Sequence, residues 1–258
     1  MPMSKLSHTR PMLLFAALTG FFVANALVAE FIGVKIFSLD LSLGLEEIKY
    51  KLFGQDSAPQ FTVGVLLWPL VFIMTDVVNE YFGQRGVRFM SFAAATLITY
   101  AFIIVNLGIV TVPAPWWTGS YAETRGLEDA QLAYSVIFGQ GTWIIAGSLI
   151  AFLVGQILDA WVFHRIRRIT GDGKVWLRAS FSTFISQFID SYIVIYIAFV
   201  LGPPKWSMAQ FFSVSTNNYI LKFAAAILLL PLIYAAHALI DRYLGKKTAA
   251  KLRREASA

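Results

Sequence analysis

The sequence predicts an all-α, polytopic membrane protein with six transmembrane helices in one bundle around a central polar cavity. Of its 258 residues, 57% are apolar and only 14% are charged, whereas soluble domains carry about 25% charged residues. The apolar residues occur in long blocks, which indicates that lipid is the solvent for much of the surface. Basic residues are concentrated in alternate connections between these blocks, which is how membrane topology is specified.

Six apolar stretches are long enough to cross a bilayer, because a helix needs about 20 residues to span roughly 30 Å of hydrocarbon. These stretches cover roughly residues 12–37, 60–80, 89–112, 142–163, 179–201 and 214–240. We therefore expect a cytoplasmic N-terminal segment at 1–11, a transmembrane domain at 12–240 and a basic cytoplasmic tail at 241–258. Residues 127–138 are too short to span, and we predict a short amphipathic helix there, on the outer face.

The distribution of basic residues between the connections predicts the orientation. One set of connections holds fifteen of them: Lys5, Arg10, Arg85, Arg88, Arg165, Arg167, Arg168, Lys174, Arg178, Arg242, Lys246, Lys247, Lys251, Arg253 and Arg254. The alternate connections hold four, namely Lys49, Lys51, Arg125 and Lys205. The positive-inside rule then places both termini in the cytoplasm, which requires an even number of spans.

Composition and missing motifs narrow the function classes. The net charge of +6 does not indicate nucleic-acid binding, because the basic residues lie in short blocks between the spans. The absence of cysteine excludes disulfides and thiolate metal sites. No zinc-protease, serine-hydrolase or Walker motif occurs. We expect a protein that is not an enzyme and that has no cofactor and no metal. Its expected partners are membrane lipid and a small-molecule substrate, and a homo-oligomer is possible.

Ionisable residues inside the spans give the functional signal, since each costs roughly 2.5–3.5 kcal/mol at a helix centre on insertion scales. Glu30, Asp76, Asp190 and Lys222 lie deepest. Polar residues recur three or four positions apart, so that they share helix faces. The predicted substrate-binding residues are Glu30, Lys35, Trp68, Asp76, Asn79, Glu80, Gln156, Asp159, Gln187, Asp190, Asn218 and Lys222. We expect Lys222 to pair with an acid, Asp190 being the best candidate, because a lone buried ammonium is costly.

The alternative interpretation of these polar stripes is structural. Carboxylate–lysine pairs and amide hydrogen bonds hold helices together in a membrane without any substrate. The number of acids against so few bases favours a water-filled cavity over such packing.

Several motifs resemble one family. The sequence contains Glu30-Phe31-Ile32-Gly33-Val34-Lys35, Trp68-Pro69-Leu70, Thr75-Asp76-Val77-Val78-Asn79-Glu80-Tyr81-Phe82-Gly83, Gln156-Ile157-Leu158-Asp159, Ser186-Gln187-Phe188-Ile189-Asp190-Ser191 and Tyr219-Ile220-Leu221-Lys222. Over about residues 20–236, the chain is similar to the queuosine precursor transporters, also called the VUT family. This resemblance implies uptake of 7-cyano-7-deazaguanine, 7-aminomethyl-7-deazaguanine or queuine across the inner membrane. The alternative is a substrate-binding membrane subunit of an energy-coupled vitamin or nucleobase importer.

Overall fold

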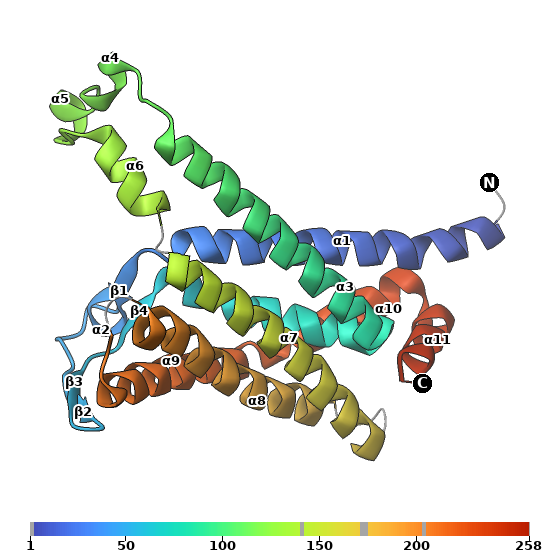
Figure 1. The fold of residues 1–258 in the computed structure, drawn as a ribbon. Helices are drawn as coiled ribbons and strands as arrows, with labels where there is room; N and C mark the ends of the chain where they lie inside the picture. Colours follow the sequence, from blue (N-terminus) through green and yellow to red (C-terminus); the bar gives the residue numbers. More distant parts are fainter. Residues whose placement is uncertain (1–2, 140–141, 171–174, 203–204, 258) are drawn as a thin grey trace.

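The computed structural model describes residues 3–139, 142–170, 175–202 and 205–257, and it confirms the all-α membrane fold. Long helices run alongside one another in a single bundle (Figure 1). The elements are α1 (Met3–Ile32), β1 (Ile36–Ser38), α2 (Leu39–Ser42), β2 (Tyr50–Leu52), β3 (Gln55–Ser57), β4 (Gln60–Thr62), η1 (Val63–Leu66), α3 (Trp68–Val110), α4 (Pro115–Thr118), α5 (Ala122–Arg125), α6 (Ala130–Phe138), α7 (Thr142–Thr170), α8 (Val175–Ile195), the π-helix η3 (Tyr196–Leu201), α9 (Met208–Leu228), α10 (Leu230–Leu244) and α11 (Lys246–Ser257).

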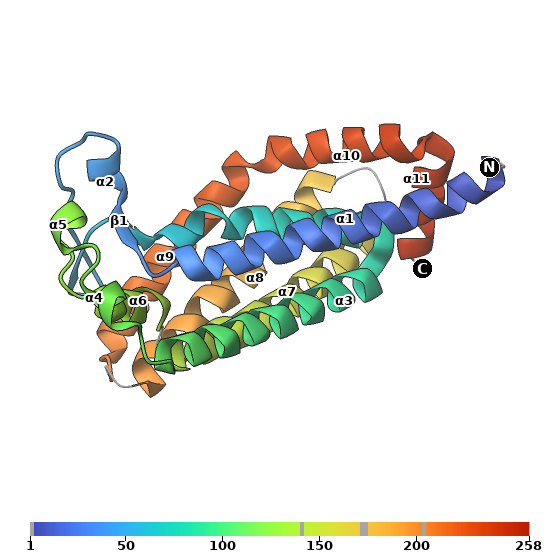
Figure 2. The ribbon, with the colours of Figure 1, turned by 90° about the horizontal axis from the view of Figure 1, so that it is seen from above.

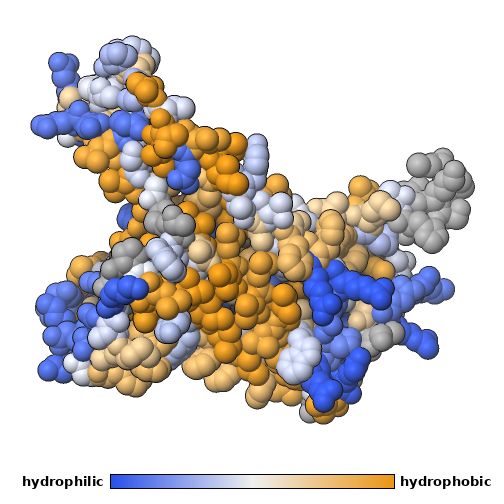
Figure 3. Space-filling model, viewed as in Figure 1, coloured by the Kyte–Doolittle hydropathy of each residue, from blue (hydrophilic) through white to orange (hydrophobic). Residues whose placement is uncertain are grey.

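The surface of the bundle has the distribution of apolar and polar residues that is expected of a membrane protein. Figure 3 shows an apolar band across the middle of the bundle and hydrophilic residues at its two ends. Inside the band, buried residues of the three helices α1, α3 and α7 form the main core, among them Phe22, Met90 and Phe152. The bundle therefore has an apolar core between these helices as well as an apolar band on its surface.

The longest helix, α3, contains two arms. Its 43 residues would measure about 65 Å as one rod, twice the hydrocarbon thickness. The helix breaks at Gly83, where φ is 68° and ψ is −174°, and Figures 1 and 2 show the chain reversing direction within α3. The predicted spans 60–80 and 89–112 fall on the two arms. In the described part of the chain, four helices pass a length-and-hydropathy criterion, or five with α9–α10 joined, so the count of six stays a prediction that the break supports.

Gly83 gives a testable consequence of this reversal. Its φ of +68° disfavours any Cβ, and an added Cβ would also lie 3.1 Å from the carbonyl oxygen of Ala256 in α11. We expect Gly83→Ala to lower the free energy of unfolding by about 1–2 kcal/mol. Thermal unfolding in detergent measures this change. Gly20→Ala is the control, because nothing lies within 4 Å of its added Cβ; equal losses for the two variants would contradict the prediction.

Short strands replace the helix ends predicted at 37 and 60. Helix α1 ends at Ile32, and β1 pairs antiparallel with β4. Gly64 allows this connection to cross the end of α1, since an added Cβ would lie 2.6 Å from the carbonyl oxygen of Ala29. In the same loop, Asp40 accepts hydrogen bonds from the backbone N–H groups of Ile48 and Leu41 at 2.6 and 2.9 Å. The bond from Ile48, followed by that from the Ser38 hydroxyl, lowers the pKa of this carboxyl group.

The last predicted span, 214–240, falls on two helices that together are long and apolar enough to cross a membrane. Helices α9 and α10 meet at a bend of 44°, and Leu229 lies between them. Pro231 is in the first turn of α10. It has no N–H to donate, and its ring would clash with the carbonyl group four residues earlier, so that α9 cannot continue through it. The predicted amphipathic helix is confirmed as α6 at Ala130–Phe138.

Both chain ends lie at one end of the bundle, whereas β1–β4 and α4–α6 lie at the opposite end (Figure 1). This arrangement agrees with the fifteen-to-four distribution of basic residues. We expect topology reporters fused after residues 50, 125 and 206 all to read external. One cytoplasmic signal among the three would contradict the orientation.

Candidate functional site

A cavity of about 390 Å³ opens among α1, α3, α7, α8, η3 and α9. Its size lies within the 300–1,000 Å³ typical of small-molecule sites. Much of the wall is apolar, with Val34, Ile144 and Val194 among its residues. Five predicted site residues line it: Glu30, Trp68, Asp190, Asn218 and Lys222. The structure thus brings together one lysine, two acids, one amide and one indole from four separate helices.

The ion pair between Asp190 and Lys222 is the charged centre of the cavity. Lys222 Nζ lies 2.7 Å from Asp190 Oδ2, and the two side chains are 10% and 8% exposed, respectively. This contact confirms the predicted pair. Gly155 of α7 lies beside Asp190, and an added Cβ would be 3.5 Å from Asp190 Cβ, an ordinary van der Waals distance. A charge-assisted bond at this length in a mostly dry site is strong and directional.

Glu30 supplies the second carboxyl group. It lies near the C-terminal end of α1, is 6% exposed, and accepts a hydrogen bond from the Ser148 hydroxyl of α7. Trp68 begins α3, and its ring centroid lies 5.7 Å from that of Phe152. The indole therefore packs on the core on one side while it contributes to the cavity wall on the other.

The other seven predicted site residues do not line this cavity. Lys35 is exposed, and the structure uses its backbone carbonyl oxygen, which accepts from the Val63 N–H at 2.8 Å. Six are buried within the bundle: Asp76, Asn79, Glu80, Gln156, Asp159 and Gln187. Helical spacing predicted that these polar residues share helix faces, but it does not show which of them line the cavity.

Three of these buried residues form a polar layer with hydroxyl groups, namely Asp76, Gln156 and Asp159. Thr75 donates to Gln156, and Ser186 donates to Asp159 Oδ1 at 3.0 Å. Ser182 donates to Asp76 Oδ1 at 3.3 Å, while Asn79 Nδ2 donates to the Ala160 carbonyl at 3.1 Å. These bonds join α3, α7 and α8. We call Asp76, Gln156, Asp159, Ser182 and Ser186 the interior polar layer.

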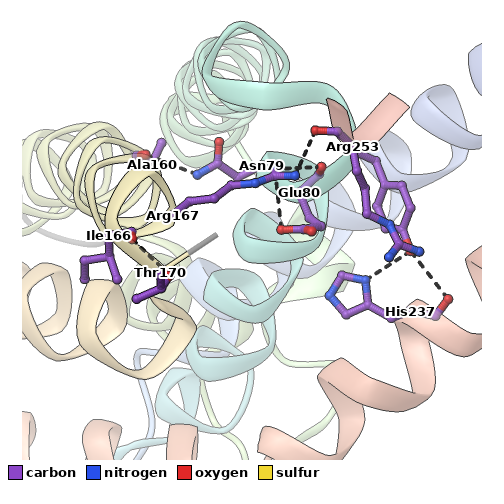
Figure 4. A network of polar contacts seen from close by, with 9 residues as sticks. Asn79, Glu80, Ala160, Ile166, Arg167, Thr170, His237 and Arg253 are labelled. Carbon is purple, nitrogen blue, oxygen red and sulfur yellow. Dashed lines mark hydrogen bonds and ion pairs between the residues drawn. The ribbon is translucent and has the colours of Figure 1, made fainter. Parts of the chain in front are cut away.

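A second network closes the end of the bundle that carries both termini (Figure 4). Arg167 is 3% exposed, and its guanidinium lies 3.5 Å from the Glu80 carboxylate. The same guanidinium donates to the backbone carbonyl of Glu80 at 3.2 Å and to that of Arg253 in α11 at 2.8 Å. Arg253 in turn bonds Asp241 and Tyr81. The sequence assigned Arg167 only to a basic connection, and nothing in its pattern signals a buried ion pair.

The opposite end of the cavity is bordered by the loop that carries the strands. Tyr50 donates to Asn217 Oδ1 at 2.6 Å, and Asn217 Nδ2 donates to the Ala58 carbonyl at 3.0 Å. The hydroxyl groups of Ser57 and Ser213 lie 2.8 Å apart. Helix α9 therefore carries cavity residues at Asn218 and Lys222, and it also bonds the loop between α1 and α3 through Ser213 and Asn217. Within the described ranges, no group of three or more His, Asp and Glu side chains is arranged to hold a metal ion.

Comparisons with known proteins agree with this architecture. A family model described as "Putative vitamin uptake transporter" matches residues 62–236. The chain is 33% identical over 194 residues, covering 74% of this chain and 76% of the relative, to the "Probable queuosine precursor transporter" of Bacillus subtilis (strain 168). It is 27% identical over 169 residues, 64% of this chain and 67% of the relative, to the "Queuosine precursor transporter" of Escherichia coli (strain K12).

A relative in Haemophilus influenzae, named "Probable queuosine precursor transporter", is 25% identical over 187 residues, which are 71% of this chain and 72% of that protein. No solved structure matches the chain. The family match includes the cavity residues Trp68, Asp190, Asn218 and Lys222 as well as the whole interior polar layer. By this match and these relatives, the chain is a membrane transporter and belongs to the vitamin uptake transporter family, whose curated members here are queuosine precursor transporters.

Proposed function

We propose that this chain takes up queuosine precursors across the inner membrane into the cytoplasm, and that 7-cyano-7-deazaguanine, 7-aminomethyl-7-deazaguanine or queuine binds in the 390 Å³ cavity. The observation that carries the proposal is the pairing of Asp190 with Lys222 in the wall of that cavity. The names of the three relatives support the substrate class.

The chemistry of the cavity suits a 7-deazaguanine. Such a base presents N1–H and a 2-amino group side by side, which one carboxylate accepts in bidentate fashion. It also presents O6, which suits the ammonium of Lys222 or the amide of Asn218. Trp68 offers an aromatic face for the flat ring system. Asp190 and Lys222 therefore match two neighbouring groups on the same edge of the base.

The cavity wall contains two acids and one lysine, a balance of charge that also suits a substrate with a cationic substituent. Glu30 lies in the same cavity, where it accepts a hydrogen bond from the neutral Ser148 hydroxyl. The ammonium of 7-aminomethyl-7-deazaguanine would gain a charge-assisted bond there.

Uptake into liposomes tests the proposal. Purified protein, reconstituted alone, should take up labelled 7-cyano-7-deazaguanine, and unlabelled 7-deazaguanines and queuine should compete. Adenine should not compete, because its Watson–Crick edge presents an acceptor at N1 where guanine presents a donor. Transport without any ATPase would exclude a subunit of an energy-coupled importer. Folded protein that binds none of the 7-deazaguanines would overturn the proposal.

A further inference from the structure

Asp159 lies below the cavity, in the interior polar layer between α7 and α8. It is 0% exposed, and it does not line the cavity. Ser186 donates to its Oδ1 at 3.0 Å, and Ser182 is a second hydroxyl bonded to the carboxyl group. Its Oδ2 is buried with no hydrogen-bond partner. One of the two carboxylate oxygens is therefore without a hydrogen bond in the fully buried interior of the bundle.

Asp159 differs from two neighbouring acids, Asp190 and Glu80, which each form an ion pair. Asp190 has Lys222 at 2.7 Å, and Glu80 has Arg167 at 3.5 Å. Across the described part of the chain, no Lys, Arg or His side chain lies within ion-pair distance of Asp159. A buried carboxylate without a cation is strongly disfavoured, and such a group takes up a proton instead.

The titratable groups around Asp159 come from three helices. Asp76 of α3 faces the layer and shares Ser182 with it. Asp190 of α8 follows Ser186 by four residues, about 6 Å along the helix axis, and is neutralised by Lys222. On α7 itself, Arg167 is two turns further along and is engaged by Glu80. Asp159 thus lies between the cavity above it and the Arg167–Glu80 network below it.

We infer that Asp159 is the proton-binding group through which a proton gradient drives uptake, an inference that rests on the proposed function. In the described conformation the carboxyl group holds a proton, because no cation among the described side chains compensates its charge. When the Arg167–Glu80 network opens, water reaches the layer, the O–H bond breaks and the proton passes to that water. Asp159 is charged only while the layer is wet, so that its protonation and the conformation of the bundle depend on each other.

In this inference Asp159 binds the proton and does not contact the substrate. Ionisable residues buried inside transporter helices serve as proton relays when they face the interior. Asp190 contacts the cavity and would change substrate affinity when altered. Asp159 is one turn below it, and its neutralisation should change the energy source of transport and leave substrate binding intact.

Asp159→Asn mimics the protonated carboxyl group at nearly constant size. The control is Glu128→Gln, which removes an acid from an exposed loop. In liposomes with an inward proton gradient, wild type and control should accumulate labelled 7-cyano-7-deazaguanine, and Asp159→Asn should lose at least 10-fold of that accumulation. Equilibrium binding and exchange of internal for external substrate should stay within threefold of wild type in all three proteins.

A second measurement needs no substrate. Infrared difference spectra of purified wild type against Asp159→Asn should contain the C=O band of a protonated carboxyl group, and those against Glu128→Gln should not. The absence of that band, proton-driven accumulation by Asp159→Asn, or loss of its binding and exchange would each overturn the inference. Accumulation by wild type under a sodium gradient alone would do so too. If wild type neither binds nor exchanges 7-deazaguanines while the band is present, the proposed substrate fails and the proton site is retained.

Discussion

Asp190→Asn should lower the affinity for a 7-deazaguanine by roughly 30- to 1,000-fold, about 2–4 kcal/mol. The substitution keeps the size of the side chain but replaces one acceptor with an N–H donor. That donor would face the N1–H and 2-amino groups of the base, and Lys222 would lose its 2.7 Å partner. Direct binding of 7-cyano-7-deazaguanine to the purified variant measures the loss.

Two controls keep this test specific. The Asp190→Asn variant must be folded, which its melting temperature and elution volume in detergent report. Glu30→Gln should reduce affinity for the 7-aminomethyl compound more than for the 7-cyano compound, since only the former carries an ammonium. A change of less than about threefold for Asp190→Asn would remove Asp190 as the residue that recognises the donor edge of the base.

Lys222→Met should lower the free energy of unfolding by up to about 3–5 kcal/mol, because it leaves the Asp190 charge buried without its partner. The methylene stem is kept, so that packing changes little, and the loss reports the ammonium group. Thermal unfolding in detergent gives the change in stability. Uptake should fall in parallel, because the cavity loses its donor for O6.

The double variant Asp190→Asn/Lys222→Met distinguishes the effect of the ion pair from the effect of each residue alone. Removing both charges should recover part of the stability lost in Lys222→Met, since no uncompensated acid remains. Binding should not recover, because both recognition groups are gone. If Lys222→Met melts at the wild-type temperature and transports normally, the ion pair has no role in either property.

The fold class was predictable because hydropathy and the placement of basic residues act over whole segments. The limits of the spans were not. Helix α1 ends at Ile32 because Gly64 brings the following connection against Ala29, a contact between positions 35 residues apart. Leu228 ends α9 because Pro231 cannot continue the same hydrogen-bond ladder. A long-range contact leaves no periodic signal in the sequence, whereas the proline is a local signal that the apolar run around it concealed.

The site was predictable in its chemistry and less so in its positions. Helical spacing grouped Asp190 with Gln187, but residues three apart still differ by about 60° around the helix axis. Asp190 therefore reaches the cavity, whereas Gln187 is buried and does not line it. Ser148, Ser182 and Ser186 bind the acids, and serine is too common in membrane helices to be singled out. Burial of Arg167 depends on α3 and α11 together, which no local pattern encodes.

The bond from Arg167 to the Arg253 carbonyl has a consequence for biogenesis. The two residues are 86 positions apart, so that a ribosome adding 5–20 residues per second needs about 4–17 s between them. During that interval α7 has been synthesised, but Arg167 cannot form this hydrogen bond because Arg253 has not been added to the chain. Synthesis of α7 and closure of this end of the bundle are therefore separate events in time, and a chain released before α11 is complete would leave this end open to quality-control proteases.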